Sequence, residues 1–198
     1  MAQDCFKTIK SLSEGSYTAK RSRFLAFALP VATTEEVKIH VAAYRKKFFD
    51  ARHICWAYML GVERLIFRAN DDGEPSSTAG KPILGQINSN ELTDILIIVV
   101  RYFGGVELGT SGLIAAYRAA AAAAINAAEI INTTVDEEIT ISFDYALLNE
   151  VLKIVREESA EIITRNYDTT CSVTLRTRQS LMPRLRERLS MTCGRLVG

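Results

Sequence analysis

An unbroken apolar run, followed by glycines and an alanine-rich stretch, is the feature that most constrains the fold of this chain. Residues 95–100 read Ile-Leu-Ile-Ile-Val-Val, without a polar residue between them. Such a run is typical of a strand that is buried on both faces of a sheet. Glycines follow within residues 104–112, and residues 119–124 are all alanine. The pattern predicts a central strand, a tight connection in which Thr110 or Ser111 caps the next helix, and close packing of that helix on the sheet.

The stretch before this run predicts further strands and helices. Residues 16–31 are expected to form one long strand that Pro30 ends. Thr33 and Glu36 have the spacing of a capping box, which predicts the start of a helix. The other predicted elements are strands at residues 53–60 and 64–68, a polar loop at residues 71–82 and a short helix at residues 83–87. Long ordered loops are more often functional than short ones, so the polar loop is a natural place for a site.

The pattern of the chain changes after the alanine-rich helix. Residues 136–138 are acidic, and residues 139–145 alternate apolar with polar side chains, as in a strand with one buried face. A helix, a hairpin and a second helix are predicted next, with a last strand within residues 194–198. This order is that of a ferredoxin-like split unit. We therefore predict an α+β protein of two domains, residues 1–134 and residues 135–198.

Composition excludes several classes of protein. A net charge of +1 and a hydrophobic fraction of 48% are ordinary for a soluble chain, so no overall field attracts nucleic acid or membranes. The longest apolar run, residues 95–100, is far shorter than the ~20 residues that a membrane-spanning helix needs. The four cysteines form no CxxC pair, and the N-terminal residues lack a signal-peptide pattern. We therefore predict a cytoplasmic protein with reduced thiols and no membrane contact.

The connection after the apolar run could bind an anion. Residues 104–112 lead into a helix, where free backbone N–H groups and the helix dipole favour negative charge. The Walker lysine and the GxGxxG pattern are absent, and the nearest likeness is to the glycine-serine phosphate loop of small-molecule kinases of the galactokinase type. Arg101 would be either an anion ligand or a structural partner of Asp71 or Asp72. Its place at a strand end beside the core favours the structural pair.

Three acidic residues of the polar loop raise the question of a metal. Asp71, Asp72 and Glu74 could hold magnesium, but their spacing is not that of a calcium loop, and ordinary turns use the same residues. His53 and Cys55 share one side of a predicted strand, yet two ligands do not make a zinc site and the deaminase pattern is absent. We therefore expect no metal and no cofactor, and a structural role is favoured for His53.

Arginines are concentrated near the end of the chain. Between residues 176 and 198 the only carboxylate side chain is that of Glu187. The pattern fits a surface that binds a phosphate backbone, although a solvated helix face explains most of it. The candidate nucleic-acid-binding residues are Arg176, Arg178, Arg184, Arg186 and Arg188.

Three stretches resemble the IMPACT/YigZ family. Residues 71–84 read DDGEPSSTAGKPIL and residues 99–117 read VVRYFGGVELGTSGLIAAY, which are similar to the two signatures of that family, and HICWAY at residues 53–58 resembles a third block. Ser77 and Ser111 stand where the family usually has glycine. The resemblance extends over nearly the whole chain. It implies a first domain like the second domain of small-subunit ribosomal protein five, and a ferredoxin-like second domain similar to one of elongation factor G.

The resemblance also implies a class of function. The eukaryotic members of the family are translation regulators that compete for an activator of the kinase sensing amino-acid starvation. We therefore expect a non-enzymatic binding protein that regulates translation through RNA, the ribosome or a protein partner, with no membrane partner and no DNA sequence specificity. The alternative is an enzyme or sensor that binds a phosphorylated small molecule or nucleotide at the glycine-rich loop. The sequence lacks a complete catalytic constellation, which favours the binding interpretation.

Both alternatives use the same candidate ligand site. Its residues come from the start of one strand, the polar loop and the stretch that follows the apolar run. They are His53, Asp71, Asp72, Glu74, Lys81, Arg101, Gly104, Gly105, Thr110 and Ser111.

Overall fold

The structure, a computed structural model, is a mixed α+β fold that describes residues 4–168 and 170–193. The chain divides into two compact units. The first is Phe6–Thr133, and the second is Thr134–Gly198 together with the first five residues. Each unit has a hydrophobic core of its own, so the two are described separately.

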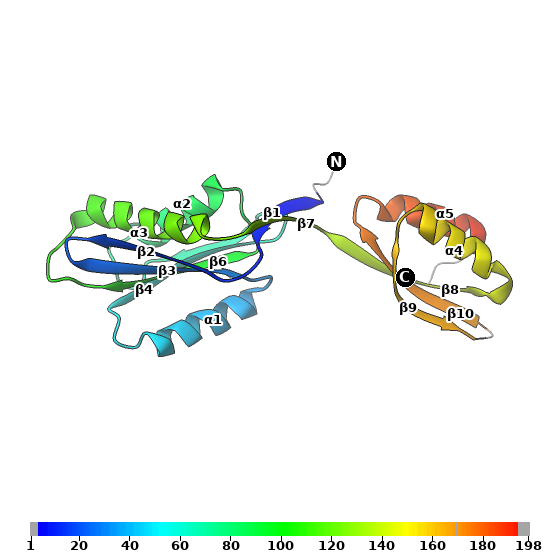
Figure 1. Cartoon of the computed structure of the whole chain (residues 1–198), viewed down its shortest axis with the longest axis horizontal. Helices are drawn as coiled ribbons and strands as arrows, with labels where there is room; N and C mark the ends of the chain where they lie inside the picture. Colours follow the sequence, from blue (N-terminus) through cyan, green and yellow to red (C-terminus); the bar gives the residue numbers. More distant parts are fainter. Residues whose placement is uncertain (1–3, 169, 194–198) are drawn as a thin grey trace. The chain divides into compact units, whose positions relative to one another are not determined.

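The first unit is built on a five-stranded sheet of order β2-β3-β6-β4-β5 (Figure 1). The central strand β6, Ile95–Tyr102, pairs antiparallel with β3 on one side and with β4 on the other. Residues 95–100 are all 0% exposed, which confirms the strand buried on both faces. The remaining strands are β2 (Ser13–Ala19), β3 (Ser22–Pro30), β4 (His53–Leu60) and β5 (Ile66–Asn70).

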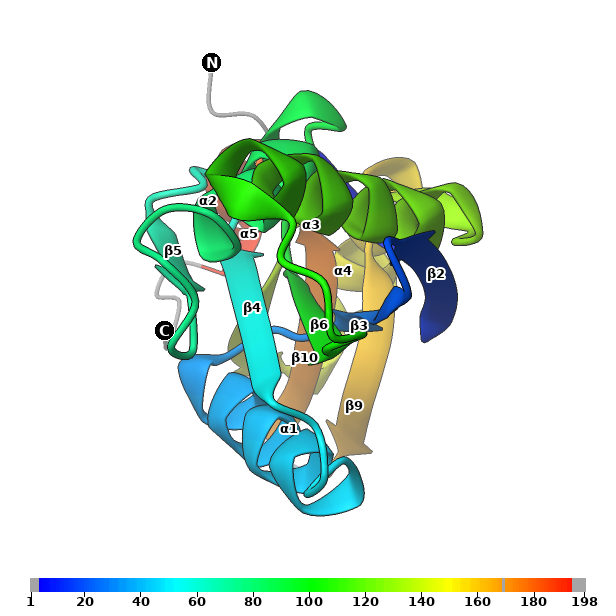
Figure 2. The same ribbon diagram turned by 90° about the vertical axis from the view of Figure 1, so that its left-hand side faces the viewer.

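Helices cover both faces of this sheet. Figures 1 and 2 place α2 (Gly80–Ser89) and α3 (Gly109–Asn126) on one face and α1 (Thr34–Lys47) on the other. The alanine-rich helix does pack very close to the sheet, since a Cβ on Gly15 of β2 would lie 2.3 Å from the backbone nitrogen of Ala124. Beside the main sheet, β1 (Cys5–Ile9) and β7 (Ile130–Thr134) form a two-stranded sheet.

The capping box at the start of α1 is confirmed. The Thr33 hydroxyl accepts a hydrogen bond from the Glu36 backbone nitrogen at 3.2 Å. The Glu36 carboxylate in turn accepts from the backbone nitrogen of Ala32 at 2.7 Å. The hydroxyl satisfies one orphan donor of the first turn, and the carboxylate holds the residue that precedes the cap, which explains why the helix begins where the local sequence predicts.

Three local predictions were wrong. Residues 16–31 form a hairpin of β2 and β3 rather than one strand, because Lys20 and Arg21 both adopt a positive φ and make a two-residue turn without its usual glycine signal. The strand predicted at residues 64–68 is β5 at Ile66–Asn70, because Arg64 is part of the preceding turn. Neither Thr110 nor Ser111 caps α3, because the helix already starts at Gly109.

The second unit pairs three strands with two helices. Its elements follow the predicted order of strand, helix, strand, strand and helix. The sheet order is β8-β10-β9, and all pairs are antiparallel. The last strand predicted within residues 194–198 lies outside the described residues. The elements are β8 (Asp136–Asp144), a short 3-10 turn (Tyr145–Leu147), α4 (Leu148–Glu157), β9 (Glu161–Tyr167), β10 (Thr170–Arg178) and α5 (Met182–Cys193).

Candidate functional site

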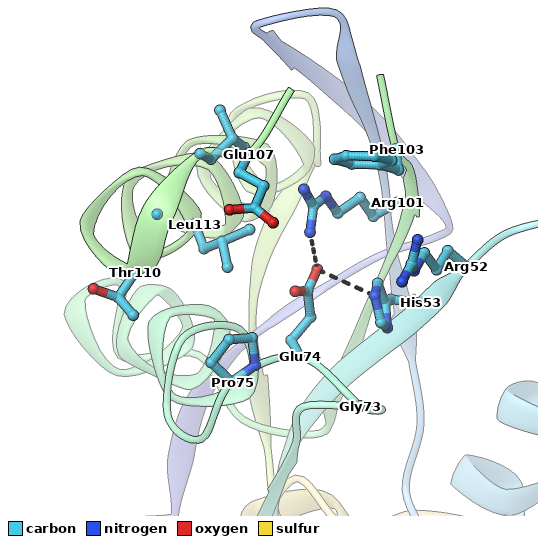
Figure 3. A pocket seen from close by; sticks show the side chains of 12 residues that line it. Arg52, His53, Gly73, Glu74, Pro75, Arg101, Phe103, Glu107, Thr110 and Leu113 are labelled. Atoms are coloured by element: carbon cyan, nitrogen blue, oxygen red, sulfur yellow. Dashed lines mark hydrogen bonds and ion pairs between the residues drawn. The ribbon is translucent and has the colours of Figure 1, made fainter. Parts of the chain in front are cut away.

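A cavity of about 460 Å³ lies in the first unit, between the sheet and the start of α3. Figure 3 shows Arg52 and His53 on one side of it, Thr110 and Leu113 on the other, and Glu74 between them. The start of β4, the end of β6, the polar loop and the N-terminal turn of α3 all contribute to the walls. The lining residues are Arg52, His53, Gly73, Glu74, Pro75, Arg101, Phe103, Glu107, Leu108, Gly109, Thr110 and Leu113.

The register of three neighbouring strands brings His53, Phe24 and Arg101 together. His53 of β4 and Phe24 of β3 are both directly opposite Arg101 of β6. Residues opposite one another in neighbouring strands point to the same face, so all three lie on the face that α3 covers. The Arg101 guanidinium lies over the rings of Phe24 and Phe103, at 5.5 Å and 5.6 Å from their centroids. The aromatic rings hold the arginine side chain where the strand ends.

A buried ion pair forms the floor of the cavity. Arg101 donates a hydrogen bond from Nη1 to Glu74 Oε1 at 2.6 Å, and the two side chains are only 7% and 3% exposed. The Tyr117 hydroxyl of α3 donates to the same Glu74 oxygen at 2.7 Å. A buried charge pair of this kind needs such additional hydrogen bonds to offset the cost of desolvation. The sequence predicted a structural role for Arg101, but its partner is Glu74 and not Asp71 or Asp72.

The two aspartates instead organise the loop itself. The Asp71 carboxylate accepts hydrogen bonds from the backbone nitrogens of Ser77, Ala79 and Gly80 at 2.8 to 3.0 Å. The Asp72 carboxylate accepts from the Ile54 backbone nitrogen at 2.7 Å and from Arg45 of α1. Aspartate side chains commonly close turns in this way. The Asp71 carboxylate is bonded within the loop, and the Asp72 carboxylate ties the loop to β4 and α1, which is why neither lies beside Arg101.

His53 lies at the edge of the cavity and connects with the loop. Its Nδ1 is 2.8 Å from the carbonyl oxygen of Asp72. A carbonyl can only accept, so Nδ1 carries the proton in this contact. The other ring nitrogen, Nε2, is 4.0 Å from Glu74 Oε1, which is beyond hydrogen-bonding distance. This contact with the backbone fits the structural role that the sequence favoured for His53.

Two further groups behind the floor stay protonated. Burial raises the pKa of the Cys55 thiol and the pKa of the Tyr117 hydroxyl far above their ordinary values. Cys55 donates to the carbonyl oxygen of Asp71 at 3.0 Å and lies 3.3 Å from the Tyr117 oxygen. A thiol attacks only as the thiolate, so Cys55 serves here as a structural donor and not as a nucleophile.

The structure brings some of the predicted site residues together and separates others. His53, Glu74, Arg101 and Thr110 line the cavity, while Asp71 and Asp72 support the loop beside it. The remaining candidates do not line it. Lys81 borders a separate hollow with Arg118 on α2 and α3, Gly104 lies against the backbone of Arg21, Gly105 turns the chain with a φ of +84°, and Ser111 is in the first turn of α3.

Sequence reasoning missed several lining residues. Arg52 precedes the His53 block by one residue, and its guanidinium lies 5.6 Å from the centroid of the Phe103 ring. Phe103 and Glu107, which line the cavity, and Tyr117, which donates to Glu74 beneath it, are all within the stretch at residues 99–117 that resembles a family signature. That stretch could have pointed to them, whereas Arg52 carries no pattern of its own.

Three of the five candidate nucleic-acid-binding arginines of the second unit form ion pairs. Arg176 forms ion pairs with Glu138 at 2.7 Å and Glu161 at 3.7 Å. Arg184 pairs with Glu158 at 3.1 Å, and Arg188 pairs with Glu157 and Glu158. These carboxylates lie far away in the sequence, so a count over residues 176–198 does not include them. Within residues 4–168 and 170–193, Arg178 and Arg186 form no ion pair.

The described part of the chain has neither a metal-binding cluster nor a membrane-spanning helix. In the part of the chain that the structure describes, no group of three or more His, Cys, Asp or Glu side chains is placed to hold a metal ion. All four cysteines are free thiols. None of the described helices combines the length and apolar character needed to cross a membrane.

Comparison with known proteins supplies the wider context. Residues 20–125 match the family model described as the Impact N-terminal domain. The chain is 35% identical to IMPACT family member YvyE of Bacillus subtilis, over 76% of this chain and 69% of that protein. It is 34% identical to IMPACT family member YigZ of Escherichia coli, over 75% of this chain and 74% of that protein. A solved structure described as a hypothetical protein aligns with a TM-score of 0.72 at 27% identity, over 96% of this chain and 93% of that one.

Proposed function

The chain belongs to the IMPACT family, and from this premise we propose that it acts as a binding protein in a role related to the regulation of translation. The translation part of the proposal rests on what is expected of the family. The binding part rests on the cavity. The cavity lies in the first unit, which contains the residues that match the family model. We therefore take it as the contact point for a partner such as RNA, the ribosome or a protein.

The observation that carries the binding proposal is the hydrogen-bonded network on the cavity floor, in which the Nε atom of Arg101 is left without a partner. Glu74, Arg101, Tyr117 and Cys55 are bonded to one another or to backbone, and the thiol and phenol are held protonated. An enzyme needs a base or nucleophile aimed at a substrate, with a pKa suited to the reaction. Groups that satisfy one another in this way instead give a rigid surface for recognition.

We also propose domain architectures for the two units. The order β8-β10-β9 leaves the far edge of β8 unpaired among the described residues, which is where the fourth strand of a ferredoxin-like unit would pair. The sheet with α2 and α3 on one face supports the likeness of residues 1–134 to the second domain of small-subunit ribosomal protein five. Residues 135–198 would then form the second domain.

A cell-free translation reaction tests the function. Purified protein would be titrated into the reaction, and both the rate of synthesis and the cosedimentation of the protein with ribosomes would be measured. We expect a dose-dependent change in rate. The double variant Arg52→Ala with Phe103→Ala removes two exposed parts of the cavity wall and should weaken the effect, while Lys46→Ala, an exposed change on α1, should match wild type. No change in rate and no cosedimentation with wild type would overturn the proposal.

One observation favours a second candidate, binding of a phosphorylated small molecule or nucleotide. The Nε atom of Arg101 is buried and has no hydrogen-bond partner, and Arg52 contributes a second cation to the same cavity. The volume of about 460 Å³ is within the ~300 to 1,000 Å³ that ligand pockets occupy. Thermal melts with inorganic phosphate, AMP, ADP, ATP and GTP would test it. A rise in the melting temperature that Arg52→Ala removes would support this candidate, and no rise with any of them would exclude it.

A further inference from the structure

A second cavity lies on the opposite face of the same sheet. Its volume is about 320 Å³, and it lies between α1 and strands β4 and β5, whose arrangement can be followed in Figure 2. We call it the aromatic slot. Its lining residues are Thr34, Val37, Lys38, Val41, Ala42, Arg45, Trp56, Tyr58 and Arg68. The HICWAY block supplies its rings, and the function proposed above assigns no role to Trp56 or Tyr58.

The slot has one aromatic wall and one aliphatic wall. Trp56 and Tyr58 are two residues apart on β4 and point to the same face, where their rings stack on one another with planes 12° apart and centroids separated by 5.9 Å. Val37, Val41 and Ala42 of α1 form the other wall. The space between these walls suits a flat, apolar group. At about 320 Å³ it is at the lower end of the ~300 to 1,000 Å³ range of ligand pockets, which suits a single ring system.

The charged residues of the slot are all cations. Lys38, Arg45 and Arg68 line it, and none of the described lining residues is acidic. Arg68, directly opposite Tyr58 on β5, places its guanidinium 5.9 Å from the centroid of the Trp56 ring and forms no ion pair among the described residues. The slot therefore combines a surface for stacking with positive charge at its margin.

The two other cations remain available to a ligand. Lys38 pairs with Glu35 on the surface, where both side chains are about 70% exposed, and Arg45 pairs with Asp72 while half of its side chain is exposed. Exposed ion pairs are worth little because water and salt screen them. A phosphate group can therefore compete with Glu35 for Lys38, and on Arg45 it can bind the N–H groups that are not used by Asp72, whose carboxylate is only 18% exposed.

We propose that the aromatic slot binds an unpaired base of single-stranded RNA, with the flanking phosphates on Arg68, Lys38 and Arg45. A flat apolar base joined to anionic phosphates matches the flat apolar slot with its cationic margin, and aromatic rings beside basic residues are how proteins hold single strands. An acidic peptide would satisfy the cations but would not use the ring wall. Bases in a duplex are already stacked, so the strand must be unpaired. The choice of RNA rests on the proposed role in translation.

The slot contains its own probe. Trp56 is the single tryptophan of the chain, so its fluorescence reports on this cavity alone. Titration of the full chain with a short unstructured RNA should quench the emission as a base stacks on the ring. The same RNA carrying a terminal dye would give the affinity by fluorescence anisotropy. Duplex RNA should bind more weakly, and single-stranded DNA of the same sequence would show how far the ribose contributes.

Substitutions inside and outside the slot test whether RNA binds there or elsewhere on the surface. Trp56→Leu should weaken binding by about five-fold to a hundred-fold, as expected for the loss of one base stack. Because Trp56 is partly buried, Arg68→Ala serves as a second variant on an exposed side chain, and it should lower the slope of log affinity against log salt by about 0.7. The matched control is Arg23→Ala, since Arg23 is exposed and lies 5.9 Å from the Tyr102 ring outside the slot.

Several outcomes would overturn the slot proposal. One is the absence of RNA binding. Another is binding without a change in Trp56 emission, or binding that Arg178→Ala with Arg186→Ala abolishes while Arg68→Ala does not, since this would place the RNA on the second unit. If the protein alters translation without quenching by RNA, the slot proposal fails and the proposed function stands. If RNA quenches the Trp56 emission but the protein has no effect on translation, the slot proposal stands and the proposed function fails.

Discussion

The two faces of the five-stranded sheet are built in different ways. On one face α3 buries a row of small side chains, and its backbone comes so close to β2 that Gly15 has no room for a Cβ. On the other face α1 buries only Val37 and Tyr44, and a slot remains beside Trp56 and Tyr58. The first face, which we call the sealed face, is tightly packed along α3 apart from the cavity at the start of that helix, and it holds the buried ion pair of Glu74 and Arg101. Tight packing fixes a polar cavity in place, whereas looser packing leaves an apolar surface open to a partner.

The largest effect should come from the ion pair on the sealed face. Glu74→Ala leaves Arg101 buried without its counter-charge, and the free energy of unfolding should fall by about 3 to 5 kcal/mol. Urea denaturation would measure the loss. Glu107→Ala, an exposed carboxylate of the same cavity, should change stability by less than ~0.5 kcal/mol.

A second variant sharpens this test. Adding Arg101→Leu to Glu74→Ala removes the uncompensated charge and should recover part of the stability, because an apolar side chain replaces a buried cation. If Glu74→Ala cost no more than Glu107→Ala, the ion pair would not be buried as described, and the contrast between the two faces would lose its main support.

The central strand allows the two faces to be compared with one type of substitution. Ile97 packs in the cluster under α2 and α3, and Ile98 packs in the cluster that includes Val37 and Tyr44 of α1, with both side chains 0% exposed. Each change to alanine should cost about 2 to 5 kcal/mol, with Ile97→Ala the larger, because the sealed face can collapse less around the cavity. Urea denaturation of the two variants would give the two losses in the free energy of unfolding. A larger loss for Ile98→Ala would reverse the assignment of the tighter face.

A glycine tests the close approach of α3 directly. A Cβ on Gly15 would lie 2.3 Å from a backbone nitrogen of α3, so Gly15→Ala should destabilise by about 1 to 3 kcal/mol through overpacking. Gly85 of α2 is the matched control, because nothing lies within 4 Å of the Cβ that alanine would add there. Gly85→Ala should stabilise by about 0.5 to 1 kcal/mol, since glycine is unfavourable inside a helix. Thermal melts showing equal effects would argue against the close contact.

The smallest effect is expected at the start of α1 on the open face. Thr33→Ala removes the hydroxyl that accepts from the Glu36 backbone nitrogen and should cost about 1 kcal/mol. Thr33→Ser keeps that hydroxyl and should lie close to wild type in the same urea series. If both variants were equally destabilised, the side chain would act through packing and not as a cap.

Short-range patterns accounted for much of the fold. The apolar run predicted the buried strand β6, alternation predicted β4 and β8, and the capping box placed the start of α1. These features depend on neighbours a few residues apart, so the sequence contains them directly. The hairpin of β2 and β3 escaped prediction because its turn uses Lys20 and Arg21 at positive φ, which no local residue preference indicates.

The site was predicted less completely, because its partners depend on how a loop folds. The local sequence was enough to place Arg101 at the end of a buried strand and a polar loop before the next helix. The folded loop is what brings Glu74, and not Asp71 or Asp72, beside Arg101, since the two aspartates bond to backbone nitrogens. The tertiary structure also pairs Arg176, Arg184 and Arg188 with carboxylates distant in the sequence. Two charged side chains pair when folding brings them close in space. The order of residues along the chain does not give that distance.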